Sequence, residues 1–447
     1  MIKIYDTMTR SLRDFVPLTE NVVNMYVCGP TVYNYIHIGN ARSAVAFDTI
    51  RRYFEYCGYT VNYISNFTDV DDKIIKAANE AGISTKELSD KFIAAFMEDT
   101  AQLGIKPATQ NPRVINYMDE IIAFVSTLVD KGFAYVSEGD VYFRVAKSNN
   151  YAKLANKTLE DLEIGASGRT DAETERKENP LDFALWKAAK EGEVSWDSPW
   201  GLGRPGWHIE CSVMATEILG DTIDIHGGGA DLEFPHHTNE IAQSEAKTGK
   251  TFANYWMHNG FVNVDNEKMS KSLGNFVTVH DMLKTVDGQV LRFFLATQQY
   301  RKPINFTEKA IHDAEVNLKY LKNTHSLPLT DQVNQDELQT YLEAFQEAMD
   351  DDFNTANGVT VLFDMAKWIN SGNYDQTVKD AFEKMLQVFG IIFEEEVLDE
   401  DIEKLIEERQ AARANKDFAT ADRIRDELAA QGIKLLDTKD GVRWTRD

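Results

Sequence analysis

The first part of the chain alternates short apolar runs with a longer stretch of helical periodicity. Val22–Val27 and Thr60–Ser65 are short runs rich in β-branched and aromatic residues, which is typical of buried strands. Between them, residues 41–56 read as a helix that ends before Gly58. A strand, a helix and a strand at this spacing predict a parallel sheet with right-handed crossovers.

The strand pattern is then interrupted and later resumes. Residues 117–203 have their own helix, a short strand from Asp140 and a polar stretch, so they read as an insertion. Strand patterns return at residues 222–226 and 261–264. We therefore expect one α/β domain that is built from residues 1–116 and 204–306.

Helical periodicity dominates the rest of the chain. We expect a helical bundle over residues 307–400, with a break near Ser371. The tail, residues 401–447, has two charged helical stretches that are separated near residues 415–417, and then a short hairpin. The predicted fold class is thus α/β, followed by a C-terminal α-helical bundle and a small terminal module.

Composition agrees with a globular chain of about three domains. Of its 447 residues, 43% are hydrophobic, and no apolar run approaches the roughly 18 residues that a membrane span requires. The N-terminus lacks the pattern of a signal peptide. The three cysteines, Cys28, Cys57 and Cys211, lie too far apart in sequence for a disulfide framework, so we expect a reducing cytoplasm.

The net charge of −25 argues at first against a nucleic-acid partner, because phosphates repel an acidic surface. The charge is unevenly distributed, however. Residues 331–408 contain 21 acidic and 4 basic residues, whereas residues 409–447 contain 7 acidic and 9 basic residues. The tail is locally basic, and global charge therefore does not exclude RNA.

Two motifs are suited to phosphate chemistry. After the first strand, His37-Ile-Gly39-Asn40 leads into a helix, whose N-terminus offers free N–H groups to a phosphate, while Gly39 leaves room for a flat base. Helix capping by His37 and Asn40 is the plainer explanation of that motif alone. Farther along, Lys268 and Lys271 lie in a Gly- and Asn-containing loop, and they suit a cationic clamp on a leaving pyrophosphate. A solvated surface loop is the alternative.

Four dispersed residues make a plausible metal set: Cys28, Cys211, His236 and Glu240. Cys28 ends the first strand, and His236 and Glu240 are four apart, so both can project from one helical face. Ligands from several strand ends suit an active-site metal. Two packed cysteines, a core histidine and a surface glutamate fit the spacing equally well, so spacing alone leaves both readings open.

The chain resembles class I aminoacyl-tRNA synthetases, whose two signatures read HIGH and KMSKS. Here they stand as His37-Ile-Gly-Asn40 and Lys268-Met-Ser-Lys-Ser272, with Asn40 replacing the second histidine by a group that carries no charge. The resemblance implies a Rossmann-like parallel-sheet catalytic domain and ATP as substrate, with Mg²⁺ expected. It implies catalytic roles for His37, Asn40, Lys268 and Lys271, and ATP binding by His37, Gly39, Asn40 and Lys271.

Over its whole length the chain resembles the bacterial cysteinyl-tRNA synthetases. The matching motifs include Tyr26–Gly29, Gly203–Cys211 and Asp224–Gly229. The resemblance implies one zinc ion on Cys28, Cys211, His236 and Glu240 that binds the thiol of L-cysteine. It also implies that Thr68 and Trp207 surround that substrate. Only the family register favours His236 over its neighbour His237, and Cys57, which has no motif around it, reads as a packed residue.

In the same resemblance, residues 401–447 are the anticodon-binding module and tRNA(Cys) is the partner of an expected monomer. Anticodon contacts are implied for Arg413, Phe418, Asp422 and Asp437. An arginine can pair with phosphate or a guanine edge, an aromatic ring can stack on a base, and carboxylates can accept from exocyclic amines. A solvated helix face is the alternative for each residue, and Trp444 is a further stacking candidate.

Two other functions remain open on sequence grounds. A cysteine ligase that acylates an aminosugar would share the catalytic core, but the basic tail favours tRNA over that acceptor. A zinc protein that binds nucleic acid without catalysis would not need two phosphate motifs around one sheet.

Overall fold

The computed structural model describes the 447-residue chain with the exception of residues 167–173, 271, 395–398, 440 and 447. For residues 164–166 it describes the backbone but not the side chains. The chain folds into two compact units, residues 1–392 and residues 393–447. No helix in the described part of the chain is both long enough and apolar enough to span a membrane.

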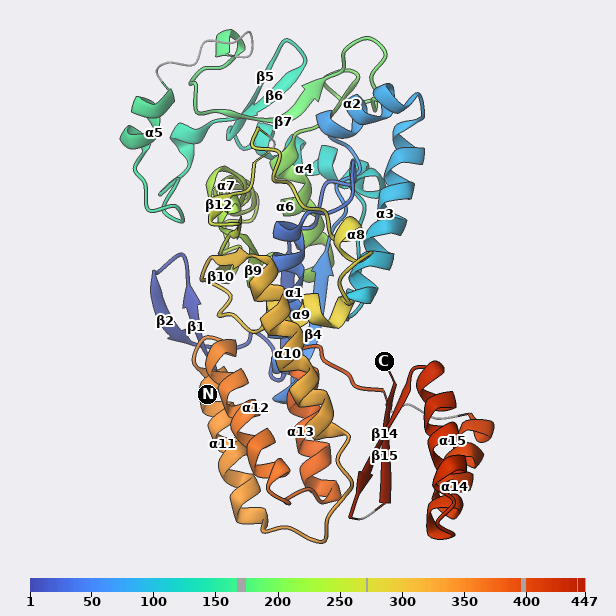
Figure 1. The fold of residues 1–447 in the computed structure, drawn as a ribbon. Helices are drawn as coiled ribbons and strands as arrows, with labels where there is room; N and C mark the ends of the chain where they lie inside the picture. The colour runs from blue at the N-terminus through green and yellow to red at the C-terminus, as the bar shows by residue number, and fades with distance from the viewer. Residues whose placement is uncertain (167–173, 271, 395–398, 440, 447) are drawn as a thin grey trace. The chain divides into compact units, whose positions relative to one another are not determined.

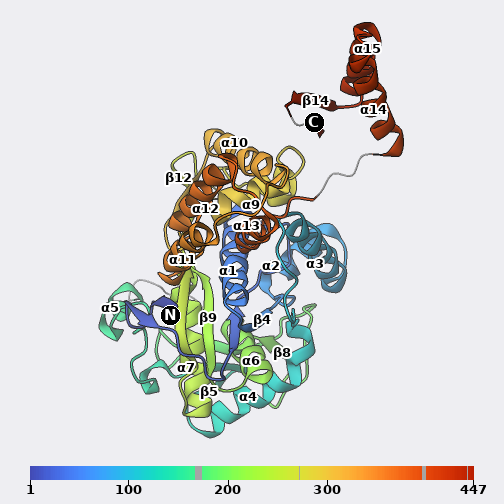
Figure 2. The ribbon, with the colours of Figure 1, turned by 90° about the horizontal axis from the view of Figure 1, so that it is seen from below.

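The larger unit is built on a four-stranded parallel sheet, which confirms the predicted fold class. The sheet has the order β10-β9-β3-β4. Its strands are β3 (Val22–Val27), β4 (Thr60–Ser65), β9 (Ile223–Gly229) and β10 (Ala253–Asn259). Helix α1 (Ile38–Tyr56) covers one face, and α6 (Trp207–Leu219) and α7 (Thr238–Thr248) lie on the other (Figure 2).

Helix α1 begins three residues before the Ala41 start that apolar periodicity predicts. His37 is its N-cap: His37 Nδ1 accepts a hydrogen bond from the Asn40 N–H, and Asn40 Oδ1 accepts one from the His37 N–H, both at 3.2 Å. This reciprocal capping satisfies two backbone N–H groups that a helix start otherwise leaves unpaired. The capping explanation of this motif is therefore confirmed, and the motif also fixes where the helix starts.

An antiparallel sheet and several helices separate β4 from β9. Helices α2 (Asp72–Ala81) and α3 (Thr85–Gln102) come first, followed by η1 (Val114–Tyr117) and α4 (Met118–Asp130). The sheet has the order β5-β6-β7-β8. Its strands are β5 (Ala134–Ser137), β6 (Asp140–Phe143), β7 (Phe183–Ala188) and β8 (Gly203–Pro205). The short elements of this region are η2 (Val145–Lys147), α5 (Leu159–Ala166) and η3 (Thr174–Arg176). Leu185 and Trp186 on β7 are fully buried in one apolar core with Ile209 and Ile223, so this sheet is packed onto the central one.

The rest of the larger unit consists of small sheets and helices. Strands β1 (Lys3–Asp6) and β2 (Ser11–Asp14) form an antiparallel hairpin. A mixed sheet contains β11 (Val262–Val264), β12 (Glu267–Lys268) and β13 (Ile304–Phe306). Short turns η4 (Ala230–Leu232) and η5 (Glu233–His237) precede α7, and α8 (Val279–Met282) and α9 (Gly288–Ala296) follow β12.

Four long helices gather at one end of this unit (Figure 1). They are α10 (Glu308–His325), α11 (Gln335–Asp350), α12 (Thr355–Asn370) and α13 (Gln376–Val388). The predicted break near Ser371 falls between α12 and α13. The domain boundaries given above remain predictions, since the larger unit is continuous from residue 1 to residue 392.

The smaller unit contains two helices and a hairpin, as its sequence predicts. Helices α14 (Glu400–Ala414) and α15 (Phe418–Ala430) are followed by β14 (Ile433–Thr438) and β15 (Gly441–Arg446), which pair antiparallel. Its core is formed by Ile402, Ile424, Leu428 and Ile433. The unit thus has an apolar core of its own.

Candidate active site and metal centre

The topology of the central sheet indicates where a ligand belongs. Strand β3 leads through α1 to β4 on one side, and its other neighbour β9 leads through α7 to β10 on the opposite side. Ligands of open α/β sheets bind at the carboxyl ends of the strands where the winding direction reverses. Cys28 follows β3 at this point, and its N–H donates to the Gly227 carbonyl of β9 at 3.3 Å.

Gly29 fixes the chain beside Cys28. Its N–H donates to Asn66 Oδ1 at 3.0 Å, and a Cβ at this position would lie 1.7 Å from the Asn66 carbonyl oxygen. Only glycine permits such a close approach of two backbones. Cys28 is thereby held where the ends of β3 and β4 meet.

A cleft of about 660 Å³ opens at this edge of the sheet. Its lining brings together most of the predicted site residues: Cys28, His37, Gly39, Asn40, Thr68, Trp207, Cys211, His236 and Lys268. Glu240 is fully buried in the floor behind His236. Lys271 lies outside the described residues.

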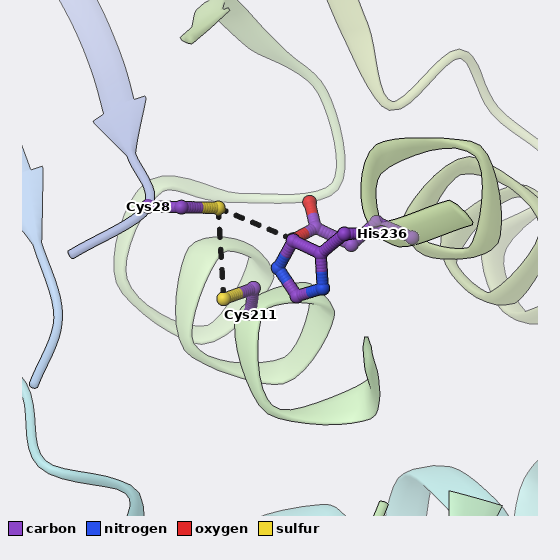
Figure 3. A group of neighbouring side chains, drawn as sticks. Cys28, Cys211 and His236 are labelled. Atoms are coloured by element: carbon purple, nitrogen blue, oxygen red, sulfur yellow. Dashed lines mark hydrogen bonds and ion pairs between the residues drawn. The ribbon is translucent and has the colours of Figure 1, made fainter. Parts of the chain in front are cut away.

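The four candidate metal ligands converge on one point. The Sγ atoms of Cys28 and Cys211 are 3.7 Å apart, Cys28 Sγ is 3.5 Å from Glu240 Oε1, and His236 Nε2 is 2.9 Å from the same oxygen. One ligand atom from each residue lies within 4.8 Å of all the others. Figure 3 shows the side chains of Cys28, Cys211 and His236 turned toward one another.

The two separations that involve a sulfur atom fit zinc, whereas the 2.9 Å between His236 Nε2 and Glu240 Oε1 is a hydrogen-bond distance, shorter than the roughly 3.4 Å expected between nitrogen and oxygen ligands. With Zn–S near 2.3 Å and Zn–O near 2.1 Å, the edges of a tetrahedron are about 3.8 Å between two sulfurs and about 3.6 Å between sulfur and oxygen. The observed 3.7 and 3.5 Å are close to both values. Two thiols, an imidazole and a carboxylate are also a donor set that zinc takes.

A second, overlapping group of ligand atoms lies beside the first. Cys28, His226, His237 and Glu240 also lie within 4.8 Å of one another. His237 Nε2 is 3.3 Å from Cys28 Sγ, and its Nδ1 is hydrogen-bonded to His258 Nε2 at 2.8 Å. The geometry therefore does not separate His236 from His237, but only the first group includes Cys211. His226 and His258 were not singled out by sequence, although His226 lies inside the Asp224–Gly229 motif.

The electrostatics of the first group favour one thiolate. The hydrogen bond with Cys28, opposed by burial, lowers the pKa of Cys211 to about 6. Burial raises the pKa of the Cys28 thiol well above its usual value. Although burial opposes it, the negative charge of Glu240 and Cys211 raises the pKa of His236 to about 10. A thiolate is the form of cysteine that binds a metal, so the group can present at least one such ligand.

Thr68 and Trp207 flank this group. The Trp207 ring stacks on the His236 ring with centroids 4.4 Å apart, and it is 43% exposed toward the cleft. Thr68 is buried, and its Oγ1 accepts a hydrogen bond from Asn66 Nδ2 at 3.1 Å. An aromatic wall and a hydroxyl thus lie next to the thiols, in a space that is open to a small substrate.

The segment that follows the second signature (residues 268–272) is hydrogen-bonded to the first signature (residues 37–40) and to the residue before it. The Ile38 N–H donates to the Val277 carbonyl, and the Val279 N–H donates to the Ile36 carbonyl, both at 3.0 Å. Lys268 on β12 is exposed, and its Nζ lies 5.5 Å from the centre of the Phe261 ring. The start of α1 and Lys268 therefore both belong to one cleft that can receive a polyphosphate.

In the smaller unit, the predicted anticodon contacts differ from one another in exposure and in their ion pairs. Phe418 is 62% exposed and available for stacking, and Asp422 is paired with Arg425 at 3.2 Å. Asp437 accepts two hydrogen bonds from Arg409, at 2.9 and 3.0 Å, and lies 2.5 Å from Arg413 Nη1.

Two residues of this unit add to what its sequence indicates. Trp444, half-buried, packs against the core of the unit. Arg409 was not singled out by sequence, because an arginine in a charged helix gives no signal that it is buried.

Comparisons with known proteins agree with these observations. Residues 14–316 match the family described as tRNA synthetases class I (C) catalytic domain, residues 344–394 match the DALR domain, and residues 395–444 match the Cysteinyl-tRNA ligase anticodon binding domain.

Two curated relatives match over the full length of both chains, and a solved structure shares the fold. The chain is 94% identical to Cysteine–tRNA ligase of Streptococcus thermophilus and 82% identical to that of Streptococcus agalactiae, over 447 residues and with complete coverage in each case. A methionyl-tRNA synthetase of Mycobacterium tuberculosis in complex with methionyl-adenylate has a TM-score of 0.60 at 15% identity, covering 82% of this chain and 89% of that one.

Proposed function

Because the chain belongs to the cysteinyl-tRNA synthetase family, a group of class I ligases, we propose that it activates L-cysteine with ATP and then transfers it to the 3′-terminal adenosine of tRNA(Cys). Activation gives cysteinyl-adenylate and pyrophosphate, and transfer releases AMP. The observation that carries this proposal is the group of Cys28, Cys211, His236 and Glu240 in the floor of a cleft that both signatures line.

Zinc is the group that these four residues would hold, with one ion per chain. When bound, zinc supplies a Lewis acid that takes a thiolate far more readily than a hydroxyl group. Serine differs from cysteine by one atom, and a pocket of ordinary contacts would separate the two poorly. We therefore propose that zinc on these thiol, imidazole and carboxylate ligands selects cysteine over serine in a single step, without a separate editing reaction.

The remaining proposed roles belong to the chain's own side chains. Thr68 and Trp207 would hold the cysteine substrate, because they flank the four candidate metal ligands and face the cleft. His37, Gly39 and Asn40 at the start of α1 would bind ATP, whose phosphates, with Mg²⁺, suit a helix N-terminus. Lys268 and Lys271 would stabilise the charge that develops on the departing pyrophosphate.

The smaller unit would bind the anticodon. Exposed Phe418 suits stacking on a splayed base, and Arg413 and Asp422 suit polar contacts with RNA. Asp437 is proposed to act in the same surface together with its arginine partners. We propose a cytoplasmic monomer as the working form.

The test is cysteine-dependent exchange of pyrophosphate into ATP, with zinc content measured on the same protein. We expect exchange with cysteine, no exchange with serine, and about one zinc per chain. Cys211→Ser should lose zinc, weaken cysteine binding by on the order of a hundredfold and narrow the gap between cysteine and serine.

Cys57→Ser is the matched control for this test, because Cys57 is half-buried and belongs to neither group of ligand atoms. It should behave as the wild type. A zinc-free protein that still rejected serine as well as the wild type would contradict the proposed role of the metal.

A further inference from the structure

Lys73 lines the cleft but has no part in the activation chemistry described above. It is the second residue of α2, it is exposed, and its Nζ lies 5.5 Å from the centre of the Tyr33 ring. Both acidic residues that precede it have other partners: Asp72 is paired with Arg204, and Asp71 caps α2 by accepting the backbone N–H of Lys73 at 2.7 Å. The ammonium group of Lys73 is therefore presented to the cleft.

The other lysines that line the cleft have different partners. Lys106 is ion-paired with Glu55, and Lys268 lies on β12 over Phe261. Within the described part of the chain, no carboxylate lies within 4.0 Å of Lys73 Nζ. Lys73 interacts electrostatically with Asp71 but forms no close ion pair, and such a cation in a substrate cleft is suited to an anionic group of a substrate.

The surroundings of Lys73 place it on the cysteine side of the cleft. The adjacent Asp72 is hydrogen-bonded to Arg204 and lies 3.9 Å from Lys187 Nζ. Arg204 belongs to β8, three residues before Trp207. The start of α2 is thus joined to the insertion sheet where that sheet leads into the Trp207 wall, and Figure 1 shows α2 beside β7.

Two substrates of the proposed reaction carry phosphates, and they need different places. The β- and γ-phosphates of ATP suit the start of α1 and Lys268, whereas its α-phosphate must reach the carboxylate of cysteine. The tRNA must bring its 3′-terminal ribose to the cysteine carboxyl group, so its last phosphodiester lies within one nucleotide of the Thr68 and Trp207 pocket. Lysine contacts with such phosphates position a nucleic acid without reading its sequence.

We propose, resting on the function above, that Lys73 binds a phosphodiester of the 3′-terminal strand of tRNA while cysteine is transferred. Lys73 is then a positioning residue for the second step of the reaction and has no role in the first. Two other anions reach this side of the cleft, the carboxylate of cysteine and the α-phosphate of ATP to which it becomes bonded, and the experiment separates both of them from the tRNA.

The experiment compares Lys73→Gln and Lys73→Arg with Lys76→Gln. Lys76 is the matched control, because it lies on the same helix, is 79% exposed, and interacts with Glu80 instead of lining the cleft. Each variant is assayed for cysteine-dependent pyrophosphate exchange and for aminoacylation of tRNA over a range of salt concentrations. Thermal unfolding is measured to show that all the variants are folded.

We expect Lys73→Gln to keep the exchange rate and the KM for cysteine of the wild type, while its KM for tRNA rises about tenfold. The slope of log affinity for tRNA against log salt should decrease by about one, the value for one lost phosphate contact. Lys73→Arg should retain most of the tRNA affinity, and Lys76→Gln should match the wild type in every assay.

Two results would overturn the proposal. One is a salt slope and a KM for tRNA that are unchanged in Lys73→Gln. The other is a fall in the exchange rate or a rise in the KM for cysteine or for ATP during exchange, which would assign Lys73 to the amino-acid carboxylate or to the α-phosphate of ATP. The exchange activity of the wild-type protein tests the proposed function separately, so the two failures are distinguishable.

Discussion

A buried ion pair joins helix α1, whose start lines the cleft, to helix α9. Asp48 on α1 and Arg292 on α9 are both almost fully buried, with Oδ2 and Nη1 2.7 Å apart. Asp48 also accepts from Arg52 Nε at 2.8 Å, and Arg292 Nε donates to the Phe389 carbonyl at 2.8 Å. Burial raises the pKa of Asp48, but the charges of Arg292 and Arg52 outweigh it and hold this pKa below its usual value.

Removing one partner of this pair leaves a buried charge without compensation. Asp48→Asn should lower the free energy of unfolding by about 3–5 kcal/mol at neutral pH. Because the pKa of Asp48 is lower in the folded state than in the unfolded state, where it is near 3.9, its stabilisation is present above that value. It is lost as pH falls through the folded pKa, so urea unfolding of the wild type below about pH 4 should show a loss that Asp48→Asn lacks.

The control for this prediction is Asp313→Asn. Asp313 is paired with Lys309 at 2.6 Å, but both side chains are more than half exposed. An exposed pair contributes at most about 1 kcal/mol. Equal losses of stability in the two variants would show that burial does not matter to the Asp48 pair.

At the scale of elements, Asp437, near the end of β14, joins the hairpin to helix α14. Its carboxylate accepts from Arg409, which is 7% exposed, and lies 2.5 Å from Arg413, which is 41% exposed. Arg413 is therefore oriented by a carboxylate that Arg409 holds in place. A base or phosphate that binds Arg413 therefore depends on the positions of Asp437 and Arg409 as well.

Arg409→Gln should weaken this arrangement without touching the catalytic cleft. We expect a rise of about tenfold in the KM for tRNA, with pyrophosphate exchange unchanged, because one charge-assisted contact contributes about 1.5–3 kcal/mol. The effect should not add to that of Asp437→Asn, since both changes break the same contact. Arg423→Gln, which alters an exposed pair with Glu427 on α15, is the control. Additive effects of the two changes would refute the shared role.

Elements were predicted well where apolar pattern alone decides them. Strands β3 and β4 have the predicted bounds, because short runs rich in β-branched and aromatic residues are typical of strands even where Asn24 and Asn62 interrupt them. Strand β9 extends to Gly229, beyond the predicted end at His226, because its last three residues are glycines that carry no strand pattern. Gly227 is required by packing, since a Cβ there would lie 2.4 Å from the Phe47 ring of α1. Glycine in such a strand signals close packing of a neighbour that sequence pattern does not identify.

The same limit applies to the site. The cleft residues could be predicted because they lie in motifs. His226 also lies in one, but its hydrogen bond to Glu240, like that of His258 to His237, joins separate elements and gives no sequence signal. The sequence left His237 as the alternative to His236, and the structure brings both histidines close to Cys28 and Glu240. Sequence periodicity predicts single elements, but it does not predict which side chains of distant segments contact one another.

At the scale of the whole molecule, the two units divide the proposed reaction between them. The cleft, both signatures and the thiol group belong to residues 1–392, and the anticodon-binding match begins at residue 395. Each unit has its own buried core. Activation and recognition of the tRNA should therefore be separable.

Deleting residues 393–447 should leave cysteine-dependent pyrophosphate exchange within about twofold of the wild type. Aminoacylation of tRNA should fall by on the order of a hundredfold or more, because each lost base-stacking contact alone contributes roughly 1–3 kcal/mol. Both assays are made on the same preparation, and circular dichroism shows whether the truncated chain is folded. Loss of exchange in a folded truncation would contradict the division of labour.

The distance along the chain between the thiol ligands also sets when the site can exist during synthesis. Cys28 and Cys211 are 183 positions apart, and Cys28 and Glu240 are 212 apart. At roughly 5–20 residues per second, a ribosome makes Glu240 on the order of 10 to 40 s after Cys28. For most of this interval the nascent chain contains β3 and the Cys28 thiol that follows it, but neither β9 nor α7 has been made to enclose them. The enclosed thiol pair is thus acquired late, and the growing chain depends on its surroundings to keep Cys28 reduced until then.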